Sequence, residues 1–266
     1  MRLCFLGNSH IACVRQAYGD DASRWSWLDA TFVGAHKGLL LETAERDRRL
    51  VPTSPEARDA FESLGGLATI DLDAYDAFVI TGCLISFAPI AQIHKGARWL
   101  GLPSLEASDD FVSEKPVLMS EGAVERIAVD LLFKRLGCRL VRHLSAMTDR
   151  PILLTSQPRI SAVISQGQWP ATYTHKSILR KGDTAPMSDL FDRAAAEAVA
   201  GSGGVFLPQP IQTRDKDILT KRSFMDGAIR LTSKGRVPQP QQDYAHANLQ
   251  YGAAVLDQIT EVLDAA

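Results

Sequence analysis

A serine placed to act as a nucleophile follows the first apolar run of the chain. Ser9 lies in the stretch Gly7-Asn-Ser-His10, directly after residues 2–6 and directly before a run with helical spacing. At the start of a helix, backbone N–H groups and the helix dipole stabilise a developing negative charge. The position therefore suits attack on an acyl carbonyl. It suits a simple helix cap equally well, so Ser9 alone does not decide between the two roles.

A candidate base and acid lie three residues apart near the other end of the chain. Asp243 and His246 come just before the last stretch with helical spacing. A serine nucleophile needs a base, and that base needs an acid to fix its tautomer and stabilise its charged form. We expect both to meet Ser9 if the last helix packs beside the first strand. The alternative is that Asp243 or His246 caps a helix.

The pattern of apolar residues predicts the elements that position these side chains. Short runs rich in β-branched and aromatic residues alternate with longer runs of helical spacing, as in a parallel sheet covered on both faces. Strands are predicted near residues 2–6, 30–33, 77–81, 152–155 and 205–207. Helices are predicted near residues 11–18, 90–100, 120–136, 189–200 and 247–263. The sequence thus predicts an α/β fold, a three-layer α/β/α sandwich.

The chain is expected to form one domain. Its 266 residues are 45% hydrophobic, and no linker rich in proline, glycine or serine divides residues 1–266. Residues 102–150 exceed what a strand–helix–strand crossover needs, so we predict a helical insertion or lid there. Residues 156–187 carry several prolines and glycines and are predicted to form a long loop near the strand ends.

Together these features resemble the SGNH/GDSL hydrolase family. Residues 7–10 resemble the family's first block, with GNSH where GDS and a small residue are commoner, and Asp243-Tyr-Ala-His246 followed by Asn248 is similar to a bacterial variant of its last block. The resemblance implies a flavodoxin-like, five-stranded parallel sheet of order 2-1-3-4-5. It also implies cleavage of a carboxylic ester, of an acetyl or other short acyl group, with Ser9 as nucleophile, His246 as base and Asp243 orienting the base.

The resemblance implies an oxyanion hole, and here the chain departs from the family. Two donors would be the backbone N–H groups of Ser9 and Gly34, with Gly38 as second choice for the glycine. The third would be an asparagine after the third strand, where this chain reads Thr81-Gly-Cys-Leu84. Loss of one such donor costs about 2.7 to 4 kcal/mol in well-studied hydrolases. The candidate substitutes are Asn8, Ser86 and Gln157.

Further candidate substrate-binding residues follow the predicted strands. In open α/β sheets the ligand lies at the carboxyl ends of the strands. This places His10, His36, Gly82 and Gln157 near the expected crevice. Each histidine could instead be a partly buried structural side chain.

Composition argues against several other classes of function. A formal charge of −2 and a pI near 6.3 provide no general attraction for nucleic acid or anionic lipid. No apolar run is long enough to cross a bilayer or to resemble a signal peptide, so a cytoplasmic protein is expected. The four cysteines are expected to be buried free thiols. No metal site is expected from the six scattered histidines, and no nucleotide cofactor, because the first strand leads into no phosphate-binding loop.

The expected partner is therefore a small-molecule or saccharide acyl ester, with no cofactor. Two alternatives stay open. The same triad could transfer the acyl group to another alcohol, or the chain could be a non-catalytic binding protein that has lost activity along with the asparagine. The sequence does not give the oligomeric state.

Overall fold

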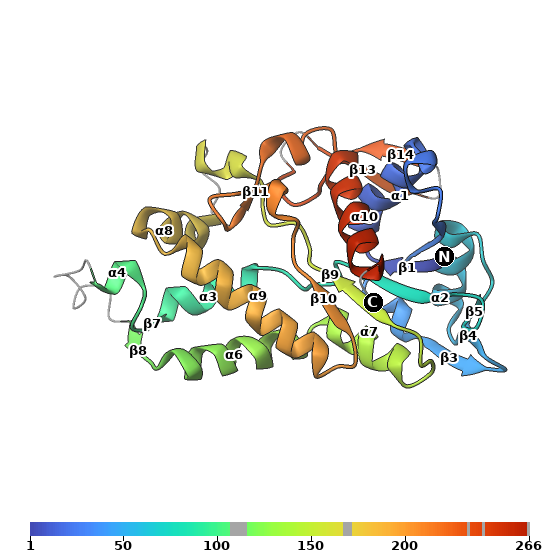
Figure 1. Ribbon diagram of the computed structural model, residues 1–266, viewed down its shortest axis with the longest axis horizontal. Coiled ribbons are helices and arrows are strands. Elements are labelled where there is room, and N and C mark those ends of the chain that lie inside the picture. Colours follow the sequence, from blue (N-terminus) through green and yellow to red (C-terminus); the bar gives the residue numbers. More distant parts are fainter. Residues whose placement is uncertain (107–115, 167–171, 233–234, 241–242, 265–266) are drawn as a thin grey trace.

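A parallel sheet forms the centre of the protein, shown by a computed structural model that describes residues 1–106, 116–166, 172–232, 235–240 and 243–264. Its strands are β1 (Arg2–Gly7), β2 (Asp29–Gly34), β6 (Ala77–Thr81), β9 (Ile152–Thr155) and β10 (Val205–Leu207). All pair in parallel, in the order β10-β9-β6-β1-β2 (Figure 1). This is the flavodoxin-like order 2-1-3-4-5, so the predicted fold is confirmed.

One face of the sheet is covered by the first and last helices, α1 (Ile11–Asp20) and α10 (Leu249–Asp264), which lie side by side (Figure 1). Phe5 and Leu153 of the sheet pack in one cluster with Val14 of α1 and Val255 of α10. A Cβ at Gly252 would lie 2.1 Å from the carbonyl oxygen of Cys13, so only glycine allows the two helices to approach this closely. The packing brings the end of β1 and the start of α10 together.

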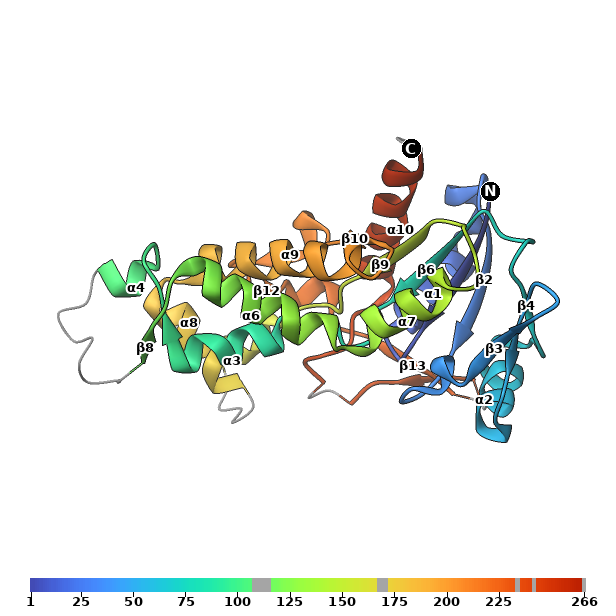
Figure 2. The ribbon, with the colours of Figure 1, turned by 90° about the horizontal axis from the view of Figure 1, so that it is seen from below.

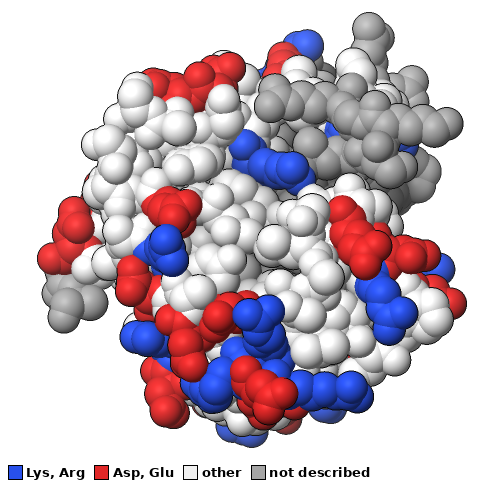
Figure 3. Space-filling model, turned by 90° about the vertical axis from the view of Figure 1, so that its right-hand side faces the viewer, with Lys and Arg blue, Asp and Glu red and all other residues white. Residues whose placement is uncertain are grey.

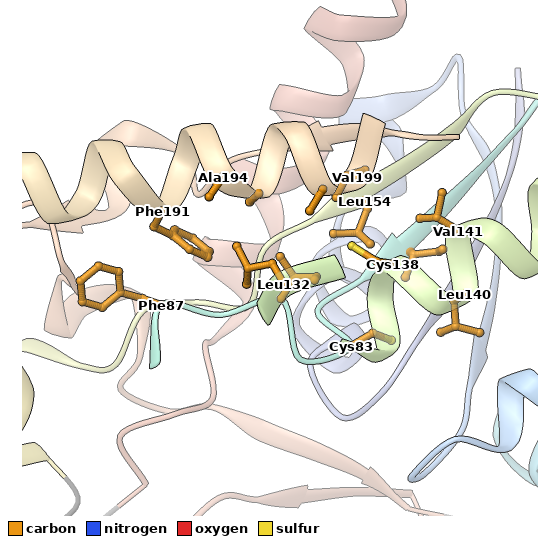
Figure 4. Packing of buried hydrophobic residues seen from close by; sticks show 14 of the residues in the cluster. Cys83, Phe87, Leu132, Cys138, Leu140, Val141, Leu154, Phe191, Ala194 and Val199 are labelled. Carbon is orange, nitrogen blue, oxygen red and sulfur yellow. The ribbon is translucent and has the colours of Figure 1, made fainter. Parts of the chain in front are cut away.

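Helices α7 (Leu136–Ser145) and α9 (Thr184–Ala200) cover the other face. Figure 4 shows Leu154 of β9 against Cys138 and Val141 of α7, with Val199 of α9 in the same cluster. This completes the three-layer sandwich. All four cysteines are buried and free, as expected.

A second group of helices extends away from the sheet. Helices α3 (Ala88–Gly96), α6 (Glu121–Phe133) and α9 run side by side, and α8 (Tyr173–Lys181) packs against α3 (Figure 2). The remaining elements there are α4 (Pro103–Glu106), β7 (Ala97–Arg98), β8 (Val117–Leu118) and η4 (Ala162–Gln166). Of the predicted insertion at 102–150, α6 belongs to this group, whereas α7 covers the sheet.

Three of the predicted elements differ from the structure. The helix expected over 90–100 ends at Gly96, and the chain continues as strand β7. The helix expected over 120–136 ends at Phe133, and Arg135 is extended (φ −73°, ψ 158°) before α7 begins. The loop expected over 156–187 contains α8, which is followed by Gly182 as a left-handed cap, and the first turn of α9. Residues 167–171 of that loop lie outside the described residues.

Smaller elements surround the free edge of β2. A sheet of β3 (Thr43–Arg46), β4 (Arg49–Pro52) and β5 (Ile70–Asp71) lies near α2 (Pro55–Ala60), which continues into the π-helix η3 (Phe61–Gly65). Helix η3 packs on β2, with Gly65 against the Val33 side chain. The other elements are η1 (Ala22–Trp25), η2 (Leu39–Leu41), η6 (Ile211–Thr213), β11 (Arg214–Asp215), β12 (Leu219–Thr220), η7 (Arg222–Phe224), β13 (Ile229–Thr232) and β14 (Gly235–Pro238).

Candidate active site

Ser9, His246 and Asp243 form a continuous chain of hydrogen bonds. The Ser9 Oγ lies 3.0 Å from the Nε2 of His246, and the Nδ1 of His246 lies 2.7 Å from Oδ2 of Asp243. The histidine ring thus joins the hydroxyl to the carboxylate through its two nitrogens. This is the order that a serine nucleophile, a base and an orienting acid require.

A tight turn fixes the carboxylate of Asp243. Its Oδ1 accepts hydrogen bonds from the backbone N–H groups of Ala245, at 2.7 Å, and His246, at 2.9 Å. Desolvation opposes ionisation of Asp243, but these two donors and the His246 side chain outweigh it, so its pKa lies below the ordinary value. Asp243 is therefore a carboxylate that can stabilise a positive charge on His246.

The alternative roles as helix caps are filled by other residues. His10 is the N-cap of α1, and the Ser9 hydroxyl bonds to His246 rather than to the helix backbone. At the start of α10, Asn248 Oδ1 accepts from the N–H groups of Gln250 and Tyr251. The geometry therefore favours the triad interpretation of Ser9, Asp243 and His246.

His10 lies behind the histidine of the triad. The two imidazole rings stack with their centroids 4.8 Å apart and their planes 17° from parallel. The pKa of His10 is lowered to about 3, mainly by burial and in addition by positive charge on His246, against the opposing effect of Asp243. The buried Nδ1 has no hydrogen-bond partner within the part of the chain described. His10 is thus a neutral ring packed against the candidate base His246.

A left-handed turn follows β6, where the family would place its asparagine. Gly82, Cys83 and Leu84 have φ of +77°, +50° and +67°. A Cβ at Gly82 would lie 3.0 Å from Asn8 Oδ1, 3.1 Å from His10 Cβ and 3.2 Å from Gln157 Cγ. Only Gly82 adopts this conformation without strain, and the two residues after it cost about 1–3 kcal/mol each.

The same contacts bring the candidate oxyanion residues together. Asn8 and Gln157 both lie against Gly82, so the two amides flank the turn. Asn8 Oδ1 accepts from the N–H of His10 at 3.2 Å, which holds that amide in place. Of the two, Asn8 borders the cavity beside Ser9. Ser86 belongs to the segment that follows the turn.

A cavity of about 680 Å³ opens beside the triad. Its lining includes five residues that the sequence predicted: Asn8, Ser9, Gly34, His36 and His246. A volume of this size is typical of pockets for small organic ligands. His10, Gly82, Gln157 and Asp243 lie behind Ser9 and His246 and are not among the described lining residues.

Sequence reasoning missed the wall opposite Ser9. Helices α2 and η3 contribute Glu56, Asp59, Ala60, Ser63 and Leu64 to it. Ser54 fixes the start of α2, because its hydroxyl accepts from the N–H of Ala57 at 3.1 Å. The spacing of 56, 59–60 and 63–64 is that of one helix face, which is the signal that could have grouped these residues.

Three further polar lining residues also escaped the sequence analysis. They are Arg15 of α1, Arg230 of β13 and Gln239, which follows β14. Arg15 donates to the carbonyl oxygen of Leu64 at 2.6 Å and so ties α1 to η3. Nothing in the local sequence links β13 or Gln239 to Ser9.

Neither a metal site nor a membrane-spanning helix was found among the residues that the structure describes, and no related protein of known function was found that would assign a role to this site. Within the described ranges, no three His, Cys, Asp or Glu side chains gather as a metal site would require. None of the described helices combines the length and apolar character needed to span a membrane. No model of a known protein family matches the chain, and no curated protein matches it. The function is therefore inferred from the geometry of the site.

Proposed function

We propose that this protein is a carboxylic-ester hydrolase of the SGNH type with Ser9 as its nucleophile. The observation that carries the proposal is the hydrogen-bond chain from Ser9 through His246 to Asp243, at the mouth of a cavity. A serine, an imidazole and a carboxylate in this order are what acyl transfer through a covalent intermediate needs.

In the first half of the reaction, Ser9 Oγ attacks the ester carbonyl carbon while His246 Nε2 takes the hydroxyl proton. The carbonyl oxygen becomes an oxyanion, which the N–H groups of Ser9 and Gly34 and the amide of Asn8 would stabilise. His246 then gives its proton to the departing alcohol as the C–O bond breaks. Asp243 stabilises the charged imidazole between these two proton transfers.

In the second half, water replaces the alcohol. His246 takes a proton from water as the hydroxide attacks the acyl-enzyme, and it returns that proton to Ser9 Oγ as the carboxylic acid leaves. Another alcohol in place of water would make the protein an acyltransferase. The left-handed turn at residues 82–84, in place of an asparagine donor, is the observation that favours a non-catalytic binding protein instead.

The test is hydrolysis of p-nitrophenyl acetate and longer esters by the wild type, Ser9→Ala and His246→Ala. We expect each variant to fold, as judged by circular dichroism, and to lose activity by at least about 1,000-fold. Ser26→Ala, an exposed serine outside the cavity, is the matched control and should keep full activity.

A fluorophosphonate probe gives a second measurement that needs no substrate. Labelling that Ser9→Ala abolishes and Ser26→Ala leaves intact supports an activated Ser9. A folded wild type that neither hydrolyses esters nor is labelled would support the binding-protein alternative.

A further inference from the structure

The cavity divides into an apolar floor and a polar rim. The buried residues that line it are all apolar, among them Ile11, Ala12, Phe32 and Ala60, and the half-buried Leu64 joins them. The exposed residues that line it are all polar or charged. A ligand that fills this cavity must therefore be apolar at its inner end and polar at its outer end.

The charged part of the rim carries both signs. Glu56 and Asp59 on α2 line the cavity together with Arg15 of α1 and Arg230 of β13. Figure 3 shows acidic and basic side chains interspersed, with uncharged surface between them, on the side of the molecule where α2 and β3 to β5 lie. The rim therefore presents no net charge to select an anionic or a cationic ligand, and it suits a polar group such as a hydroxylated alcohol.

The positions of Gly34 and His246 orient an ester in this cavity. The proposed oxyanion donor Gly34 is flanked by the floor, since a Cβ there would lie 3.6 Å from Ile11 Cγ2 and 3.9 Å from Leu64 Cβ. The oxyanion derives from the acyl carbonyl, so the acyl chain continues past Gly34 toward Ile11 and Leu64.

The alcohol lies on the other side of the scissile bond. It receives its proton from His246, so it must leave on the His246 side. That side includes the rim residue Gln239, because the Asp243 N–H donates to the carbonyl oxygen of the neighbouring Pro240 at 2.9 Å. The rim residue Arg230 belongs to β13, which pairs with β14, the strand before Gln239. The apolar floor thus faces the acyl group and the polar rim faces the alcohol.

We propose that the floor formed by Ile11, Ala12, Phe32, Ala60 and Leu64 binds the acyl chain of a medium-length ester, from hexanoyl to decanoyl, with a polar alcohol at the rim. The inference rests on the proposed function and names its substrate class. An acetyl group would leave most of the floor uncovered, whereas each further methylene covers more apolar surface.

The first measurement is kcat/KM for p-nitrophenyl acetate, butyrate, hexanoate, octanoate and decanoate. We expect kcat/KM for octanoate to exceed that for acetate by at least about tenfold, since each buried methylene contributes about 0.8 kcal/mol, close to a fourfold factor. Hydrolysis that depends on Ser9 but is fastest for acetate would overturn the acyl-floor proposal while leaving the proposed function intact.

Two variants should move this preference in opposite directions. Ala12→Leu fills the floor and should lower the octanoate-to-acetate ratio of kcat/KM by about tenfold or more. Leu64→Ala enlarges the floor and should move the optimum toward decanoate. Ala146→Leu, at an exposed position after α7, is the matched control and should leave the ratio unchanged. Ratios that neither floor variant changes would contradict the assignment.

A binding measurement separates the floor from catalysis. In Ser9→Ala, calorimetry should show that octanamide binds with a Kd at least about tenfold lower than that of butanamide, because the floor buries the additional methylenes. Tight octanamide binding without ester hydrolysis by the wild type would support the floor and refute the proposed function. Equal, weak binding of the two amides would refute the floor.

Discussion

The protein contains two His–Asp pairs of similar geometry in different surroundings. His246 Nδ1 lies 2.7 Å from Asp243, and His94 Nε2 lies 2.6 Å from Asp183. The side chain of His246 is 23% exposed beside a cavity, whereas that of His94 is 1% exposed between helices. Distance alone therefore does not distinguish a catalytic pair from a structural one.

The position of the serine makes the difference. Ser9 bonds to the free nitrogen of His246, so the ring lies between hydroxyl and carboxylate. In the other pair, Ser104 gives both its hydroxyl and its backbone N–H to Asp183, at 2.6 and 2.8 Å. Asp183, at the start of α9, thus accepts hydrogen bonds from residues of both α3 and α4. Among the described hydrogen bonds, none joins the His94 ring to a serine. The first pair can move a proton, and the second holds helices together.

Replacing the aspartate of each pair by asparagine should give the largest difference in activity between the two pairs. In Asp243→Asn, backbone donors hold the side-chain oxygen, so the new amide N–H faces His246 Nδ1 and forces the proton onto Nε2. The base can then no longer accept the Ser9 proton, and kcat should fall by about 10⁴-fold. Asp183→Asn should retain activity within about tenfold per folded molecule, measured by ester hydrolysis. Similar losses in both would remove the distinction between the pairs.

Stability should show the reverse order. Asp183→Ala removes the acceptor of three buried hydrogen bonds and should lower the free energy of unfolding by about 3 kcal/mol or more. Asp243→Ala leaves its donors closer to solvent and should cost about 1 kcal/mol. Urea unfolding followed by circular dichroism measures both. A larger loss of unfolding free energy in Asp243→Ala than in Asp183→Ala would contradict the structural role given to the His94–Asp183 pair.

A third contrast concerns the backbone near each pair. A Cβ at Gly82, where φ is +77°, would lie 3.0 to 3.2 Å from the side chains of Asn8, His10 and Gln157. A Cβ at Gly96, close to His94 in sequence, meets nothing within 4 Å. We expect Gly82→Ala to cost about 2 kcal/mol and to displace Asn8, with a fall in kcat/KM. Gly96→Ala should change neither value measurably. If Gly82→Ala has the same free energy of unfolding as the wild type, the turn can adjust to a Cβ at residue 82 and the predicted strain is absent.

The sheet, and the three side chains that the structure joins by hydrogen bonds, could be predicted from sequence because their signals are local. Strands that are buried on both faces of a sheet have nearly unbroken apolar sequences, so all five strands of the sheet could be predicted from such runs. Ser9 follows the first strand, where the carboxyl ends of parallel strands meet, whereas Asp243 and His246 precede the last helix, which packs beside α1. The missing asparagine was also visible in the sequence, but the left-handed turn at 82–84 was not.

The cavity wall could not be predicted because it depends on tertiary packing. Glu56, Asp59 and Leu64 reach Ser9 only because η3 packs on the free edge of β2. The break between α6 and α7 likewise has no proline to mark it. A Cβ at Gly137, in the first turn of α7, would lie only 2.7 Å from Ile85 Cγ1 and 2.8 Å from Leu154 Cδ1, so close packing against the sheet determines where α7 begins.

The smallest expected effect concerns pH and two buried histidines, one in each region. Burial lowers the pKa of His10, beside His246, to about 3 and that of His175, beside Phe87 in the helical group, to about 4, from an ordinary value of 6.5. In the unfolded chain each binds a proton as pH falls through about 6.5, whereas the folded protein does not. Each histidine therefore makes the protein less stable as pH falls from about 6.5, and the loss continues down to the folded pKa.

Replacing either histidine by phenylalanine should reduce this dependence. Between pH 6 and pH 5 the wild type should lose about 1 kcal/mol more unfolding free energy than His10→Phe or His175→Phe, as measured by urea titration. The two variants should differ in activity, because only His10 stacks on the base. If His10→Phe keeps the wild-type pH dependence while His175→Phe flattens it, then His10 takes up a proton in the folded protein and cannot be the neutral ring behind His246.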